Sequence, residues 1–461
     1  MIDRRFMMRF VPLFVLGFSL AATSCMVGPD FKKPGNNLPL CWASNAPPHS
    51  NMNELRTWWN IFGDSQLTSL LNNAVADNPD MRMALIRVRE ARSSAKIQGS
   101  SLLPSMSTSS SAVRGGGLTG ASAASFAHSV NASWELDVFG GNRRAIEAAE
   151  AILLSTEANA IAVRTALMAE VATIYFTWIA NCDQLQVAKD QLELQRRTLK
   201  IVQDRNVVGF ASDLDLQQAL SQVAGTEGNI PFIEANMKSS TNTLGVLLGS
   251  YMSRVTLKQP SKMTAGKTPE IPIGLPSDLL RRRPDIIGAE ADLHAAVAEI
   301  GVATADMFPK FSLTGGLPTG SKKFFDLYDS KSGTWNIGGS MNQALYQGGA
   351  LRERVKMSKA SAERYTEAYR KTLVTAVSEV EEALINYASY RSRLVSLKKQ
   401  NEANKKSAEY ALKLYIAEMT DFLNVVSAQQ ALMSSEEAIV TMKQNIRKSV
   451  VQLALALGGG W

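Results

Sequence analysis

The chain has 461 residues, a formal net charge of +7 and an apolar content of 45%, with few aromatic residues. Its basic residues are spread along the chain and form no stripe of the kind that binds nucleic acid, so no nucleic-acid partner is expected. Three cysteines, Cys25, Cys41 and Cys182, are too few and too scattered for a disulfide framework.

The first 24 residues have the features of a signal peptide. A basic start is followed by an apolar run over residues 10–22, which is too short for a stable membrane anchor. Small residues then lead to Cys25, as in bacterial lipoprotein signals, and this resemblance predicts an S-diacylglycerol and N-palmitoyl group on Cys25. The alternative is an ordinary secretory signal with a chance cysteine. No later run suggests a membrane helix, so a membrane crossing is expected to use strands.

A helix is predicted from Pro79 to Leu103, and the sequence period then changes from 3.6 to 2. Alternation is weak over Ser105–Val113 and clear over Phe126–Val138. Apolar and polar residues that alternate over about ten positions are typical of a transmembrane barrel strand. A half-buried sheet in a soluble domain alternates in the same way, so both readings stay open here. The expected apolar face carries Phe126, His128, Val130, Ala132, Trp134, Leu136 and Val138.

Two stretches without glycine or proline follow, over residues 142–208 and 350–457. At about 1.5 Å per residue, the first alone would form a helix of roughly 100 Å, longer than a compact domain needs. Gly209 is expected to end it in a left-handed cap, and Ser212 or Asp213 to cap a returning helix. These helices are therefore predicted to bridge a distance.

The same plan is found twice. Asn78-Pro79-Asp80 is matched by Arg283-Pro284-Asp285 at an offset of 205 residues, and Leu214 by Leu423 at 209. Strands are expected again over Lys310–Leu317 and Thr334–Tyr346. Collinear markers of this kind indicate tandem duplication. The predicted divisions are a lipoprotein signal peptide (1–24), a lipidated leader with a short helix (25–78), a first repeat (79–250), a linker (251–283) and a second repeat (284–461).

Two strands in each repeat give four in the chain. An open sheet edge leaves backbone groups unpaired in lipid, so a membrane sheet must close, and four strands are too few to close. Two copies would give eight strands around a filled interior, and three would give twelve around a lumen. Geometry permits both numbers, and a channel function favours three.

Four segments together resemble the outer-membrane lipoproteins of multidrug efflux systems: residues 25–34, 275–286, 344–349 and 420–425. The resemblance to this TolC-type family covers nearly the whole chain. It implies an α+β membrane protein: a homotrimer with a twelve-stranded β-barrel in the outer-membrane lipid, continuous with a long periplasmic α-helical barrel. It also implies a conduit function, with an inner-membrane pump and a periplasmic adaptor (membrane fusion protein) as partners.

The turns that join the long helices are the candidate functional sites, because in the family such tips meet the adaptor and the second pair closes the pore. The alternative assigns the same residues to helix caps and packing seams. The candidate gate residues are Asp421, Leu423, Asn424 and Ser427, with Leu423 expected to form an apolar ring and Asp421 a polar one. The candidate adaptor contacts are Gly209, Ser212, Glu418 and Thr420.

No enzyme, metal or cofactor is expected. The histidines are isolated, and the glycines at 115, 117 and 120 match a dinucleotide fingerprint only formally. The second candidate function is a lipid-anchored periplasmic scaffold or adaptor built on coiled coils. It shares the anchor and the long helices but has no use for the predicted membrane hairpins.

Overall fold

The computed structural model describes residues 26–35, 39, 42, 54–116, 120, 122–251, 256–258 and 282–461. The predicted signal peptide, Cys25 and most of the predicted linker lie outside these residues. The chain forms two compact units, and each takes segments from both halves of the sequence. Unit 1 comprises Met1–Asn36, Arg87–Glu157 and Gly288–Lys371, and unit 2 comprises Asn37–Ile86, Ala158–Ile287 and Thr372–Trp461.

Long helices and one sheet account for most of the described chain. In chain order the elements are η1 (Glu54–Phe62), α2 (Ser65–Asp77), α3 (Pro79–Gly99), η2 (Ser100–Leu102), β1 (Ser105–Gly116), β2 (Ser122–Leu136), α4 (Gly141–Val207), α5 (Asp213–Leu247), α7 (Pro284–Ala305), β3 (Lys310–Ser321), η5 (Phe324–Asp326), β4 (Asn336–Asn342), α8 (Ala350–Ile416) and α9 (Phe422–Ala456).

The element order confirms the internal duplication. Helices α4 and α8 each have 67 residues, and α5 and α9 each have 35. The starts of α3 and α7, and of β1 and β3, are 205 residues apart, whereas those of the four long helices are 209 apart. Four additional residues therefore lie in the second hairpin. The compact units cut across the repeats, so the domain boundaries assigned from the sequence stay a prediction.

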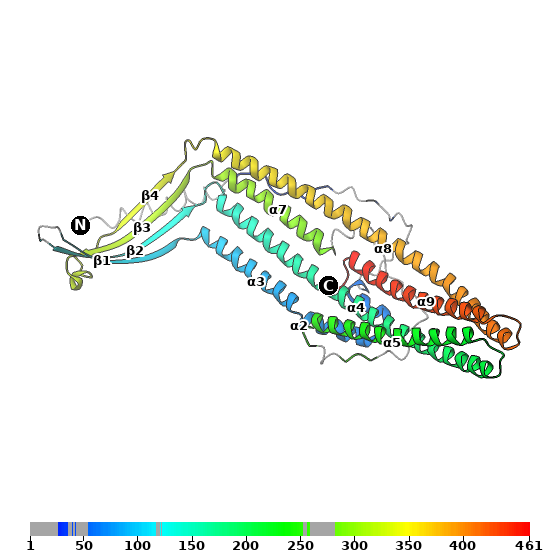
Figure 1. Ribbon diagram of the computed structural model, residues 1–461. Helices are drawn as coiled ribbons and strands as arrows, with labels where there is room; N and C mark the ends of the chain where they lie inside the picture. Colours follow the sequence, from blue (N-terminus) through cyan, green and yellow to red (C-terminus); the bar gives the residue numbers. More distant parts are fainter. Residues whose placement is uncertain are drawn as a thin grey trace. The chain divides into compact units, whose positions relative to one another are not determined.

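The sheet is antiparallel, with the strand order β1-β2-β3-β4, and its strands lie side by side as a curved ribbon (Figure 1). Val130 pairs with Leu317, and Trp134 pairs with Leu313, so these apolar side chains share one face. The next register positions carry polar residues, such as Glu135 opposite Ser312. The alternation predicted from the sequence is therefore confirmed, with one apolar face and one polar face.

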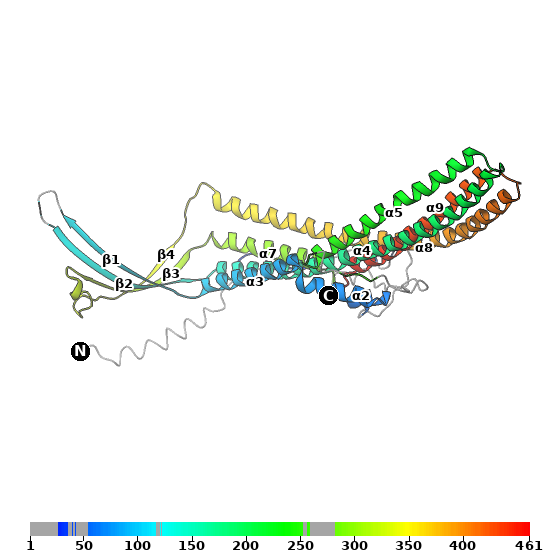
Figure 2. The ribbon, with the colours of Figure 1, turned by 60° about the horizontal axis from the view of Figure 1, so that its bottom comes forward.

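The predicted strand ends were less accurate. Strand β1 continues to Gly116, three residues beyond the predicted end, and β2 ends before Val138. Strand β4 was predicted over Thr334–Tyr346 but covers only Asn336–Asn342. It pairs only with the Lys310–Gly316 part of β3 and lies at the sheet edge, so no neighbour extends the ladder within one chain. Figure 2 shows the β1–β2 hairpin reaching beyond the other pair.

Helix α4 corrects one expectation. It contains a stretch that by length and composition could cross a membrane, although none was expected, and half of that stretch is buried within the protein. Part of the reason is an aromatic contact in unit 2. Phe176 packs against Phe62 at 4.6 Å between ring centroids, and the Tyr175 hydroxyl donates to Asp64 at 2.6 Å. An apolar stretch here serves a core.

The two repeats close in the same way within unit 2. The Asn78 side chain donates to the carbonyl of Leu247 at 2.9 Å, and Arg283 donates to that of Ala456 at 3.0 Å. Both donors precede the proline that begins a helix, where the missing N–H costs nothing. Both acceptors lie at the end of a returning helix, where carbonyls lack helical partners. The same link is thus made with different residue types.

Small residues form the helical core of unit 1. Ala148 and Ala151 of α4 meet Ala295 and Ala298 of α7, and a neighbouring cluster joins α7 to α8 at Ala362. Because alanine has no side chain beyond Cβ, the helix axes can approach closely. The alanine-rich stretch at the start of the first long helix therefore serves close packing, as its composition predicted.

Candidate functional site: the helical hairpin tips

The first tip joins α4 to α5. Gly209 adopts a φ of +81°, which favours glycine, and the N–H of Phe210 donates back to the carbonyl of Arg205 at 2.8 Å. Ser212 then caps α5: its hydroxyl accepts from the N–H of Asp215 at 3.1 Å, and the Asp215 carboxylate accepts from the N–H of Ser212 at 3.3 Å. This reciprocal capping box makes the first tip locally complete.

The second tip joins α8 to α9 with the same backbone but different chemistry. Glu418 stands at the position equivalent to Gly209 and has a φ of +61°, the one positive φ among the described non-glycine residues. The N–H of Met419 donates to the carbonyl of Leu414 at 2.9 Å, which repeats the bond of the first tip. A side chain in this conformation costs about 1–2 kcal/mol, so the second turn is held under strain.

Arg205 links the two tips. Its guanidinium donates to the carbonyl of Ile416 at 2.8 Å and to the Glu418 carboxylate at 3.0 Å. It also lies over the rings of Tyr415 and Phe210, at 5.4 and 5.8 Å from their centroids. The strained turn of the second tip is therefore stabilised by a side chain from the first.

An apolar cluster lies beneath these turns and consists of Val202, Ala219, Tyr415, Phe422 and Val425. The rings of Tyr415 and Phe422 are 5.2 Å apart, and the Tyr415 hydroxyl reaches Asp215 at 3.5 Å. Burial, together with the nearby Asp215 carboxylate, raises the pKa of the Tyr415 hydroxyl. The hydroxyl therefore stays protonated at neutral pH and serves as a donor across the two tips.

The predicted gate residues lie on the outside of this cluster. Leu423 is 59% exposed, whereas its neighbour Phe422 is 1% exposed. Asp421 and Ser427 are also exposed, and Asp421 forms the N-cap of α9 without a side-chain capping bond. Asn424 donates to the hydroxyl of Thr420 at 2.7 Å. This pair lies at one end of a shallow depression of about 550 Å³ between α8 and α9.

The predicted adaptor contacts also lie at the turns. Gly209, Ser212 and Glu418 are exposed, and Thr420 is half-buried. Sequence reasoning missed Arg205 as the link between the tips. A basic residue in the last turn of a helix is a common capping signal, but nothing in the sequence shows that its acceptors lie more than 200 residues away. The large apolar side chains exposed at the first tip are Val207, Val208, Phe210 and Leu214.

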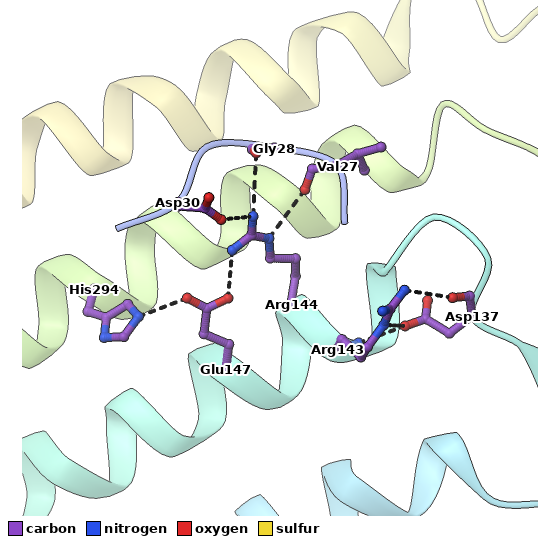
Figure 3. Close-up of polar contacts among 8 residues, drawn as sticks. All are labelled: Val27, Gly28, Asp30, Asp137, Arg143, Arg144, Glu147 and His294. Atoms are coloured by element: carbon purple, nitrogen blue, oxygen red, sulfur yellow. Dashed lines mark hydrogen bonds and ion pairs between the residues drawn. The ribbon is translucent and has the colours of Figure 1, made fainter. Parts of the chain in front are cut away.

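The predicted lipidation site, Cys25, lies outside the described residues, but the residues that follow it are described. They contact unit 1 where β2 passes into α4: the N–H of Val27 donates to the carbonyl of Phe139 at 3.1 Å. Arg144 of α4 binds three leader residues and Glu147, as Figure 3 shows. This leader contact was not predicted from the sequence.

Comparison with known proteins gives a consistent family. The family model described as "Outer membrane efflux protein" matches residues 70–250 and 275–459. The chain is 30% identical to the pyoverdine export outer membrane protein OpmQ of Pseudomonas aeruginosa, over 97% of both chains. It is 29% identical to the cation efflux system protein CusC of Escherichia coli, over 96% of this chain and 97% of that one.

Solved structures show the same fold. The outer-membrane channel OprN superposes with a TM-score of 0.88 at 29% identity, over 95% of this chain and all of that one. A crystal structure of CusC gives a TM-score of 0.86 at 27% identity with the same coverage. The likeness therefore extends through the sheet, the long helices and both tips.

Proposed function

The chain belongs to the outer membrane efflux protein family, and from this premise we propose that its two hairpin tips are the periplasmic end at which the channel closes and binds its adaptor. The protein is an outer-membrane channel of a tripartite efflux system, with the fold of the trimeric TolC-like channels. Three chains with four strands each close a twelve-stranded barrel, and the long helices continue it as a periplasmic tube. The relatives are channel proteins.

The gate is assigned to the second tip because its exposed residues have little role within the chain. Leu423 projects away from the apolar cluster that buries Phe422. The Asp421 side chain makes no capping bond to α9, although aspartate is a common N-cap residue. Three copies would place an apolar ring from Leu423 beside a polar ring from Asp421, with Asn424 and Ser427 on the following turns.

The link through Arg205 gives this gate a way to open. Closing requires the second tip to stay against the first, and the Arg205–Glu418 pair and the Tyr415–Asp215 contact both hold it there. Glu418 is 60% exposed at its side chain, so water can replace this bond at small cost. A partner that pulled the tips apart would also relieve the strained turn at Glu418.

The adaptor is proposed to bind the exposed residues of the turns, namely Gly209, Ser212, Glu418 and Thr420. The apolar side chains around the first turn support this, because exposed apolar patches mark surfaces that bind other proteins. An inner-membrane pump is the third component. The names of relatives refer to pyoverdine, cations and toluene as cargo. Since one tube serves such different substrates, we place the choice of cargo in the pump.

Single-channel conductance in planar bilayers tests the gate. Leu423→Ala is expected to raise the conductance of the closed channel, because it widens the apolar ring. The matched control is Leu214→Ala, which changes the equivalent residue of the first tip and leaves the second tip intact. An unchanged closed state in Leu423→Ala, or an equal rise in Leu214→Ala, would remove Leu423 from the gate.

Photo-cross-linking in cells tests the adaptor contact separately. A cross-linker at Ser212 is expected to capture a periplasmic protein of the efflux system, whereas one at Glu193, exposed more than four turns earlier in α4, is expected to capture much less. If Ser212 never captures an adaptor while the channel still exports its cargo, the proposed contact is wrong.

A further inference from the structure

The leader, residues 26–35, lies on unit 1 as a fitted segment. Its first described residue, Met26, contacts Gly140, where a Cβ atom would lie 2.4 Å from the Met26 Cγ. Gly140 has a φ of +77°, so glycine is favoured there for two reasons. The backbone bond between Val27 and Phe139 lies next to this contact. The leader therefore begins at the turn that joins the barrel strand β2 to the tube helix α4.

The leader backbone next crosses α7 at two glycines. Gly28 has a φ of +92°, and a Cβ atom built there would lie 2.5 Å from the Cα of Gly301. A Cβ atom on Gly301 would in turn lie 2.6 Å from the Cγ of Arg144. Such close approaches are open only to glycine. The leader, α7 and the Arg144 side chain thus fill one space without room for another atom.

Arg144 is the centre of this contact, and its side chain is 2% exposed. It donates to the carbonyls of Val27 and Gly28 at 3.3 and 3.4 Å, and to the carboxylates of Asp30 and Glu147 at 2.6 and 2.8 Å (Figure 3). Three of these four acceptors belong to the leader. Without the leader, the cation would lose most of its partners, and an unpaired charge is strongly disfavoured when buried.

Further contacts extend along the leader. The ring of Phe31 stacks on that of His294 at 4.5 Å between centroids, and His294 is bonded to Glu147 at 2.8 Å. Lys33 pairs with Glu290 at 2.6 Å. Arg144, Glu147 and His294 therefore form one connected polar network under the leader, which reaches from α4 to α7.

We propose that Arg144 is a positioning residue for the membrane anchor. It holds the leader so that residue 26 stays at the strand-to-helix turn, at the periplasmic rim of the barrel. Acyl chains on Cys25 would begin about 3.8 Å from residue 26, since consecutive Cα atoms have that spacing. The anchor would then enter the membrane beside the barrel wall rather than at the end of a free tether. This proposal goes beyond channel function and does not depend on the gate or on the adaptor contact.

Limited proteolysis of the full-length, lipidated trimer in detergent tests the proposal. Trypsin can cut the leader after Lys32, whereas the following Lys33-Pro34 bond resists it. Docked chain is protected from proteases and free termini are not. Arg144→Met is expected to release the N-terminal lipopeptide at least tenfold faster than the unchanged protein, and Arg144→Lys to fall between them. Arg92→Met, which breaks the exposed pair with Glu157 in the same unit, is the control and should leave the rate unchanged.

A purely structural role for Arg144 predicts a different result. General loosening would speed cleavage after Arg205, at the tip, by the same factor as cleavage after Lys32, and this outcome would overturn the proposal. If Arg144→Met fails to assemble, Asp30→Asn tests the leader side of the pair and is expected to speed release severalfold. An unchanged rate in both Asp30→Asn and Arg144→Lys would also overturn it.

A distance measurement reports the position of the leader directly. Spin labels on Lys32→Cys and Arg92→Cys, in a Cys41→Ser background, are expected to give one narrow distance distribution by pulsed electron resonance. The distribution should broaden in Arg144→Lys. An equally narrow distribution at the same distance in Arg144→Lys would show that the leader is held by other contacts.

Discussion

Two arginine clusters, one in each compact unit, show how the same side chain can fix a segment or merely restrain it. Arg144 is 2% exposed and faces two carboxylates, whereas Arg205 is 17% exposed and faces the single carboxylate of Glu418, which is 60% exposed. Burial opposes the charge of Arg144, but its bonds with Asp30 and Glu147 raise its pKa. A dry, fully paired cation is hard to release, while a wet pair exchanges with water. The first cluster suits an anchor and the second a releasable link.

The largest expected effect is at the releasable link. Arg205→Ala removes hydrogen bonds from a charged donor to Ile416 and Glu418, which are each worth about 1.5–3 kcal/mol. The closed-state conductance in planar bilayers is expected to rise at least tenfold. Arg196→Ala, which breaks the exposed pair with Glu227 on the same helix, is the control and should change little. Equal conductance in the two variants would contradict a holding role for Arg205.

The next effect concerns the anchor cluster and pH. Burial opposes ionisation of Glu147, but hydrogen bonds from His294 and Arg144 outweigh it, so the pKa of Glu147 is lowered. This stabilisation is present above the pKa of an unfolded glutamate and is lost as the pH falls through the lower folded value. The melting temperature of the trimer in detergent should therefore fall in acid, by a few degrees in part through this group.

Glu147→Gln provides the comparison, because it removes the titrating group and keeps the shape of the side chain. Its melting temperature is expected to be lower than that of the unchanged protein at neutral pH and to vary less in acid. If the two proteins lose stability in parallel as the pH falls, Glu147 does not contribute to the pH dependence.

A smaller effect separates the two turns. At both Gly209 and Glu418 the backbone has a positive φ, so glycine should be more stable than alanine by about 1 kcal/mol at either position. Gly209→Ala is expected to destabilise its tip, and Glu418→Gly to be more stable than Glu418→Ala. Hydrogen exchange at the adjoining helix ends measures both. If alanine were the more stable residue at position 418, the turn could not be strained.

The smallest effect concerns the caps. Ser212→Ala should cost about 1 kcal/mol because it breaks the capping box with Asp215. Asp421→Ala should cost only a few tenths of that, since the Asp421 side chain makes no capping bond. Exchange rates in the first turns of α5 and α9 distinguish the two. Equal losses of protection would mean that Asp421 caps its helix in solution.

Local patterns predicted much of the fold. The alternating faces of β2 and β3, the ends of the long helices near Gly209 and Gly349, and the duplication could all be read from spacing, because each depends on neighbouring residues. The short β4 could not, since its end depends on what pairs with it. The equivalence of Asn78 and Arg283 was also hidden, because different side chains make the same bond.

The candidate site was only partly predictable for a similar reason. Exposed turns between long helices follow from glycine and capping residues, so the tips could be placed from the sequence. The roles of Arg205 and Arg144 depend on partners more than 100 residues away. Their partners become identifiable only once the helices are packed. The gate and adaptor residues stay predictions until the experiments above are done.

The unequal edges of the sheet have a consequence for assembly. When chains close a cylinder, β4 of one must pair with β1 of the next, because these are the two edges. The shorter has seven residues, or about 24 Å at 3.4 Å per residue, close to the apolar band of roughly 25 Å in such barrels. Each joint between subunits therefore spans the lipid with no spare rungs. Shortening β4 by one pair should make the cylinder split along these three lines before any strand pair inside a subunit separates.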